Sequence, residues 1–135
     1  MVLIVRAALM LAGLLFVVLG GTFLLDPIGQ GGDFGVSPNG NRGLSTIRAD
    51  FTAYFWIAGG SLIIGAWRRD RTLLLVAAAI MAITCIVRGV SLVLDGPYDG
   101  WSMPMAVEAF VVIIALFGSR ALPQSANVTD QSEML

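Results

Sequence analysis

Residues 72–117 read TLLLVAAAIMAITCIVRGVSLVLDGPYDGWSMPMAVEAFVVIIALF. Two long apolar runs flank a short polar segment, and each run contains a single charged residue far from its ends, Arg88 in the first and Glu108 in the second. Both residues are equally distant from Tyr98 along the chain. If both runs are helices, a rise of about 1.5 Å per residue places each charge about 10 Å from the polar segment. The pattern predicts a helical hairpin whose basic and acidic side chains meet at one depth inside a membrane, where charge is costly and usually paired.

The composition of the whole chain favours lipid as its surroundings. Of its 135 residues, 57% are hydrophobic and 13% are charged, and the mean hydropathy is +0.86. A soluble domain of this length has too little interior to bury so much apolar surface. The chain contains neither histidine nor lysine, and Cys85 is its only cysteine. We therefore predict no cofactor, no metal site, no His-based triad, no Schiff base and no internal disulfide.

Four segments are long and apolar enough to cross about 30 Å of hydrocarbon. The predicted helices span about 3–25, 47–67, 72–94 and 102–120. We predict an all-α fold, an integral membrane four-helix bundle, with residues 1–122 as one domain. The polar segment 123–135 is predicted to be a disordered cytoplasmic tail.

The placement of arginine predicts the orientation of the bundle. Three arginines lie in the short connection 68–71, and Arg6 and Arg120 flank the outer ends of the first and last segments. By the positive-inside rule both termini are predicted to be cytoplasmic. The long connection 26–46 is then extracytoplasmic, either as a flexible loop or as a lid over the outer mouth of the bundle. With a formal net charge of −1 and no basic patch, nucleic acid is not an expected partner.

Small and polar residues form stripes that predict which helix faces pack together. The clearest stripe has heptad spacing: Ala77, Met81, Thr84, Arg88, Ser91, Asp95. Similar stripes run along the other segments: Gly13 and Gly20; Ile47, Asp50, Tyr54, Ala58, Ser61 and Gly65; Glu108, Ala115 and Ser119. We expect Ser45 to cap the second segment, within about two turns of Asp50.

The polar side chains of the outer half form the candidate site, with either a structural or a ligand-binding role. Its residues are Arg48, Asp50, Tyr54, Arg88, Ser91, Asp95 and Glu108.

From Ile47 onward, about two thirds of the chain resembles a known family. The matching pieces are 47–50 (Ile-Arg-Ala-Asp), 59–60 (Gly-Gly), Arg88 with 91–96 (Ser-Leu-Val-Leu-Asp-Gly), and Glu108. These pieces are similar to a bacterial family of four-transmembrane-helix domains of unknown function, loosely DoxX-like. One departure is Gly89 after the arginine, because the family more often places glycine before it. The resemblance implies a multi-pass protein of the bacterial inner (plasma) membrane and supplies no activity.

Two interpretations of Arg88 and Glu108 remain open. The pair either locks the last two helices in register, or lines a polar pocket open to the outer leaflet. In the pocket, Arg88 would hold an anionic head group or carboxylate, and Glu108 would accept a proton or donate to it.

We predict a non-enzymatic accessory or ligand-binding subunit with a charged pocket, which carries no catalytic residue. One alternative is a carrier of a lipid-like or small anionic ligand. A weaker alternative is a lipid- or isoprenoid-modifying enzyme that uses Glu108 or Asp50 for proton transfer. Expected partners are the lipid bilayer, such a ligand, and a larger membrane complex or a homo-oligomer.

Overall fold

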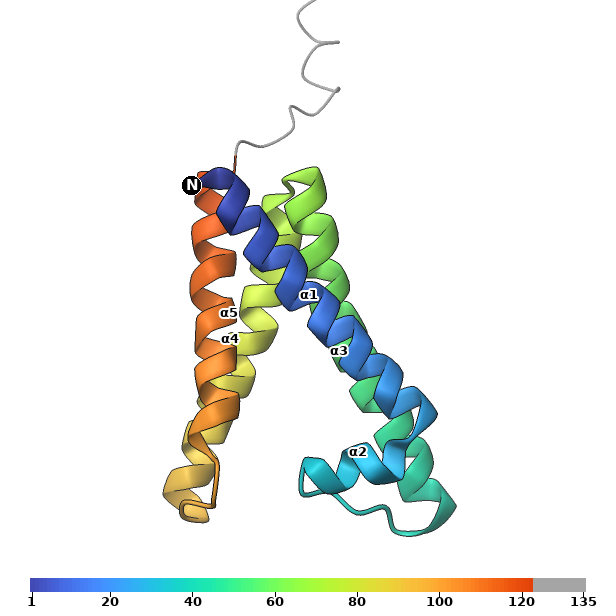
Figure 1. Cartoon of the computed structure of the whole chain (residues 1–135). Coiled ribbons are helices and arrows are strands. Elements are labelled where there is room, and N and C mark those ends of the chain that lie inside the picture. The colour runs from blue at the N-terminus through green and yellow to red at the C-terminus, as the bar shows by residue number, and fades with distance from the viewer. Residues whose placement is uncertain (123–135) are drawn as a thin grey trace, which may run out of the picture.

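The structure, a computed structural model, describes residues 1–122 and is helical throughout its regular elements (Figure 1). The helices are α1 Val2–Leu25, α2 Pro27–Asp33, α3 Gly40–Arg68, α4 Arg71–Leu94 and α5 Ser102–Ala121. All but α2 are long and apolar enough to cross a membrane. The predicted all-α fold with four such helices is confirmed. The predicted tail, residues 123–135, lies outside the described residues.

The connection between the first two spans is more ordered than predicted. Residues 26–46 contain α2, whose N-terminus is capped by the Asp26 side chain accepting from the backbone N–H of Gly29 at 3.0 Å. The following span begins at Gly40 rather than at Ile47. Ser45 therefore lies inside α3, and the prediction that it caps this helix was wrong. Periodicity missed the start because the first two turns of α3 are almost entirely polar or glycine.

Helices α1 and α3 pack closely where two glycines meet. A Cβ atom on Gly13 would lie 2.8 Å from the carbonyl oxygen of Gly59, and one on Gly59 would lie 2.6 Å from the carbonyl oxygen of Gly13. Neither helix can carry a side chain at this point without moving its neighbour's backbone. The small residues thus let the two backbones approach, as such residues commonly do between membrane helices.

An aromatic cluster holds α2 against α1 and α3. Phe23, from α1, is fully buried, and its ring stacks on Phe51 of α3 with centroids 4.6 Å apart. Phe34, directly after α2, meets the edge of Phe23 at 5.2 Å. Burial of aromatic rings contributes most of the packing energy available to so short a helix. The cluster therefore fixes α2 to the pair formed by α1 and α3.

The α4–α5 hairpin joins the rest of the bundle mainly at one end. Near that end, a Cβ atom on Gly65 of α3 would lie 2.9 Å from the side chain of Leu74 on α4. On the other side, a Cβ atom on Gly118 of α5 would lie 2.8 Å from the side chain of Leu9 on α1. The hairpin and the α1–α3 pair diverge toward the opposite end, where α2 lies (Figure 1).

We expect Asp70→Ala to reduce the free energy of unfolding by about 1 kcal/mol. Oδ1 of Asp70 accepts hydrogen bonds from the backbone N–H groups of Thr72 at 2.8 Å and Leu73 at 3.2 Å, which caps α4. Asp70→Asn is the matched control because asparagine caps helices about as well as aspartate. Chemical unfolding in detergent, followed by circular dichroism, measures both variants. Equal losses would show that capping is not what Asp70 contributes.

Candidate functional site

The structure brings Arg88 of α4 and Glu108 of α5 into direct contact. Nε of Arg88 donates to Oε1 of Glu108 at 2.7 Å. Glu108 is buried, with 6% of its surface exposed, whereas 32% of the Arg88 side chain is uncovered. Of the two charges, the carboxylate is therefore the one held inside the protein, and the guanidinium reaches its edge.

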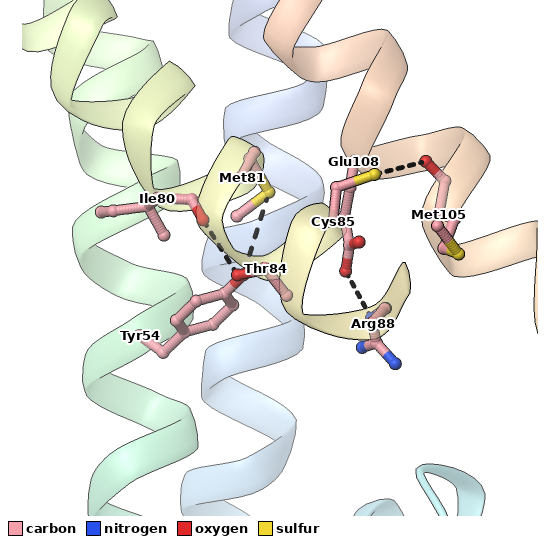
Figure 2. Close-up of polar contacts among 8 residues, drawn as sticks. All are labelled: Tyr54, Ile80, Met81, Thr84, Cys85, Arg88, Met105 and Glu108. Carbon is pink, nitrogen blue, oxygen red and sulfur yellow. Dashed lines mark hydrogen bonds and ion pairs between the residues drawn. The ribbon is translucent and has the colours of Figure 1, made fainter. Parts of the chain in front are cut away.

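The contact leaves hydrogen-bonding capacity on both partners. Figure 2 shows that the two Nη atoms of Arg88 point away from Glu108. Oε2 of Glu108 is buried and has no hydrogen-bond partner among residues 1–122. Tyr98, in the α4–α5 connection, is a further neighbour of the guanidinium. An arginine that donated through two nitrogens of one edge would satisfy both carboxylate oxygens, so this geometry is an incomplete pair.

A chain of hydroxyl groups connects α3 to α4 beside the pair. The Tyr54 and Thr84 oxygens are 2.7 Å apart, and Thr84 Oγ1 donates to the backbone carbonyl of Ile80 at 2.9 Å. Because that bond uses the threonine proton, Tyr54 is the donor to Thr84. The Tyr54 phenol is also close enough to interact electrostatically with Glu108 and Arg88.

Tyr98, Thr84 and Cys85 make contacts at or beside the pair but were missing from the predicted site. Thr84 lies on the heptad stripe, so a hydroxyl in an apolar run was the available signal for it. Cys85 donates a weak hydrogen bond to the carbonyl of Met105 at 3.8 Å and links α4 to α5 next to Glu108 (Figure 2). A lone cysteine in an apolar run gave no sequence signal of this contact.

The remaining predicted site residues do not join this pair. Nε of Arg48 donates to the carbonyl of Leu24 at 3.1 Å, at the C-terminal end of α1 where a cation is favoured. Ser91 of α4 donates to the side chain of Asp95, the residue directly after this helix, at 2.7 Å and in an exposed position. The predicted residues therefore separate into local groups rather than one connected cluster.

Asp50 is exposed on α3. Its position relative to Arg88 follows from the way α3 pairs with α4. Tyr54 of α3 faces Thr84 of α4, and the two helices are antiparallel. One turn beyond Tyr54 on the same face is Asp50, and one turn beyond Thr84 is Arg88. By this register the two charged residues lie at one level along their antiparallel helices.

The stripes of small and polar residues agree with the observed burial except at the end of the α4 stripe, where Ser91 and Asp95 are exposed. Glu108 is buried together with the other residues of its predicted stripe, Ala115 and Ser119. In the longer stripe of α3, most members are buried or half-buried and Asp50 is the exposed exception. Within residues 1–122, no group of three or more His, Cys, Asp or Glu residues is arranged to hold a metal ion.

We expect Tyr54→Phe to lower the free energy of unfolding by about 1 kcal/mol, because it removes a half-buried hydrogen bond between α3 and α4. Thr84→Val removes the acceptor and tests the same contact. If the hydroxyl pair is the cause, the double variant loses less than the sum of the two single variants in equilibrium unfolding. Strictly additive losses would contradict the contact.

Comparison with known proteins gives a family for the chain. A family model described as "Domain of unknown function (DUF4345)" matches residues 4–119. The match includes α1 and α2, so it extends well beyond the resemblance recognised from Ile47 onward. No curated protein and no solved structure matches the chain.

Proposed function

The chain belongs to the DUF4345 family of domains of unknown function, and on that premise we propose its function from the geometry of its own charged site. It is a multi-pass protein of the bacterial inner membrane, with both termini in the cytoplasm. Arg88, in the outer half of the bundle, binds the anionic group of a lipid-like ligand. The protein binds this ligand without transforming it.

The distribution of arginine supports this orientation. The N-terminus, the α3–α4 connection and the end of α5 lie at one end of the molecule (Figure 1). That end carries Arg6, Arg120 and the three arginines of 68–71. Positive charge of this kind is retained on the cytoplasmic side. Arg88 is six residues from the end of α4, which is about 9 Å along a helix, and so belongs to the outer half.

The single observation that carries the proposal is the uncovered edge of the Arg88 guanidinium, which faces away from Glu108. Its Nε contacts Glu108, its Nη atoms point away, and about a third of the side chain is uncovered. A guanidinium fork matches the paired oxygens of a carboxylate or phosphate. The uncovered part of the guanidinium can take a further partner at this depth in a bilayer, and an anionic head group supplies one.

Binding is favoured over catalysis by the positions of the two candidate acids. An acid–base mechanism would use Glu108 or Asp50. Glu108 is buried with one oxygen engaged by Arg88, and Asp50 is exposed on α3. Among residues 1–122, neither carboxylate is hydrogen-bonded to a serine, threonine or cysteine side chain. A role as an accessory subunit is a different outcome, indicated by a stoichiometric protein that co-purifies from native membranes.

The test compares an anion that has a long alkyl chain with one that has only a methyl group. We expect the protein in lipid nanodiscs to bind decanesulfonate in calorimetric titration, and Arg88→Gln to weaken that binding by tenfold or more, since charged hydrogen bonds contribute about 1.5–3 kcal/mol. Arg42→Gln is the matched control, because Arg42 is an exposed arginine on α3 and its loss changes the net charge equally. Equal weakening in both variants would overturn Arg88 as the binding residue. Equal affinity for methanesulfonate would overturn the lipid-like ligand.

A further inference from the structure

Glu108 has unusually few partners for a buried carboxylate. It is more than nine-tenths buried, and its hydrogen bond to Arg88 uses only Oε1. Oε2 has no partner within residues 1–122. A buried carboxylate is stable when it is paired and fully hydrogen-bonded, and otherwise it neutralises by taking up a proton. Glu108 therefore depends on Arg88 for its charge.

Among residues 1–122, the groups around Glu108 contain no second cation that could replace Arg88. From α4, the titratable neighbours are Arg88 and Cys85, and the phenol of Tyr54 approaches from α3. Tyr98, in the α4–α5 connection, is a neutral neighbour of the guanidinium. Helix α1 packs on α5, and its only charged residue, Arg6, lies at the opposite end and donates to the carbonyl of Ala66. Arg48 of α3 does not reach Glu108 either, because it donates to the carbonyl of Leu24 at the end of α1.

An anion bound to the uncovered edge of Arg88 changes the charge balance around Glu108. It places a second negative charge next to Glu108, and the two anions then share one guanidinium. Two like charges in one poorly solvated site favour protonation of one of them. A sulfonate or phosphodiester stays ionised throughout the accessible pH range, so the proton goes to the glutamate.

Resting on the proposed function, we propose that the binding of an anionic head group at Arg88 is coupled to the uptake of one proton by Glu108. The proton comes from the aqueous phase and is held by the carboxyl group, whose Oε2 is the oxygen with no partner in the ligand-free protein. The net charge of the site is then the same before and after binding. Release of the anion returns the proton to solution.

The direction of the pH dependence follows from this coupling. Because the bound state holds more protons than the free state, lowering the pH strengthens binding. The dissociation constant falls by up to tenfold for each unit by which the pH is lowered, because up to one proton is taken up with each anion. The same coupling makes the stoichiometry of proton uptake approach one.

The experiment titrates the wild-type protein in nanodiscs with decanesulfonate, whose charge is constant between about pH 5 and 8. Calorimetry in two buffers of different ionisation enthalpy counts the protons taken up, without any variant. We expect close to one proton per bound anion, and a dissociation constant that falls as the pH is lowered. Glu108→Gln, which resembles the protonated side chain, should bind with little pH dependence and without proton uptake.

Asp50→Asn and Asp95→Asn are the controls, because both carboxylates are exposed near the site. Both variants should keep the proton uptake of the wild type. Binding by the wild type with neither pH dependence nor proton uptake overturns the coupling and leaves the proposed function intact. Loss of proton uptake in Asp50→Asn or Asp95→Asn also overturns it. If decanesulfonate does not bind at any pH, the proposed function itself fails.

Discussion

Replacing Gly59 with alanine should destabilise the protein by about 1–3 kcal/mol, the usual effect of overpacking a close contact. The new Cβ atom would lie 2.6 Å from the carbonyl oxygen of Gly13 and 3.0 Å from the backbone nitrogen of Val17. Backbone atoms on a neighbouring helix cannot rotate out of the way as the end of a side chain can. The α1–α3 pair must therefore separate, which also loosens the aromatic cluster that holds α2.

Gly60→Ala is the matched control for this substitution. Gly60 is the next residue in α3, and a Cβ atom there has nothing within 4 Å. Both substitutions change helix propensity equally, by about 0.5–1 kcal/mol in favour of alanine. We therefore expect Gly60→Ala to leave the unfolding free energy unchanged or to raise it slightly, as measured by denaturant titration in mixed micelles. If the two variants behave alike, α1 and α3 do not cross at Gly59.

Arg88→Gln should destabilise the protein by about 3–5 kcal/mol, the range seen when one partner of a buried ion pair is removed. It leaves Glu108, which is only 6% exposed, without its counter-charge, so that the side chain must either stay charged in a poorly solvated place or take up a proton. Glu108→Gln should destabilise it less, because the Arg88 side chain is 32% uncovered and can reach water or lipid head groups. The asymmetry follows from burial and not from the strength of the contact, which is common to both variants.

A double variant separates the contribution of charge pairing to stability from the contribution of packing. In Arg88→Leu with Glu108→Leu, both charges are gone and apolar volume is kept, so the loss should be well below the sum of the single leucine variants. Thermal melts in one detergent, with all variants at the same pH, provide the comparison. Unchanged melting of both Arg88→Gln and Glu108→Gln would show that the two side chains do not form a buried pair.

The sequence predicted the α4–α5 hairpin closely because apolar runs define its ends. The predicted bounds 72–94 and 102–120 compare with Arg71–Leu94 and Ser102–Ala121. The beginning of α3 and the whole of α2 were not predicted, since they are too polar or too short for periodicity to detect. The residues that could have located α2 were Asp26, a capping residue, and the proline that follows it.

Within the site, the contact between Arg88 and Glu108 follows from the length of the connection between two antiparallel helices. The position of Arg48 could not be inferred in the same way. Its long side chain can turn to either side of α3, and the carbonyl of Leu24 that receives it is set by how α1 ends. Contacts within a helical hairpin can thus be predicted from the spacing of residues along the chain. Contacts between distant segments depend on how the helices pack.

The two-residue connection between α3 and α4 has a mechanical consequence. Arg69, with φ of 57°, and Asp70 are all that separate the ends of the two helices. With 24 residues, α4 is a rigid lever about 36 Å long. A tilt of about 5° at this pivot displaces the far end of α4 by roughly 3 Å, the reach of one hydrogen bond. Arg88, about 26 Å along α4 from this pivot, would move by roughly 2 Å with the same tilt, while the helix itself keeps its shape.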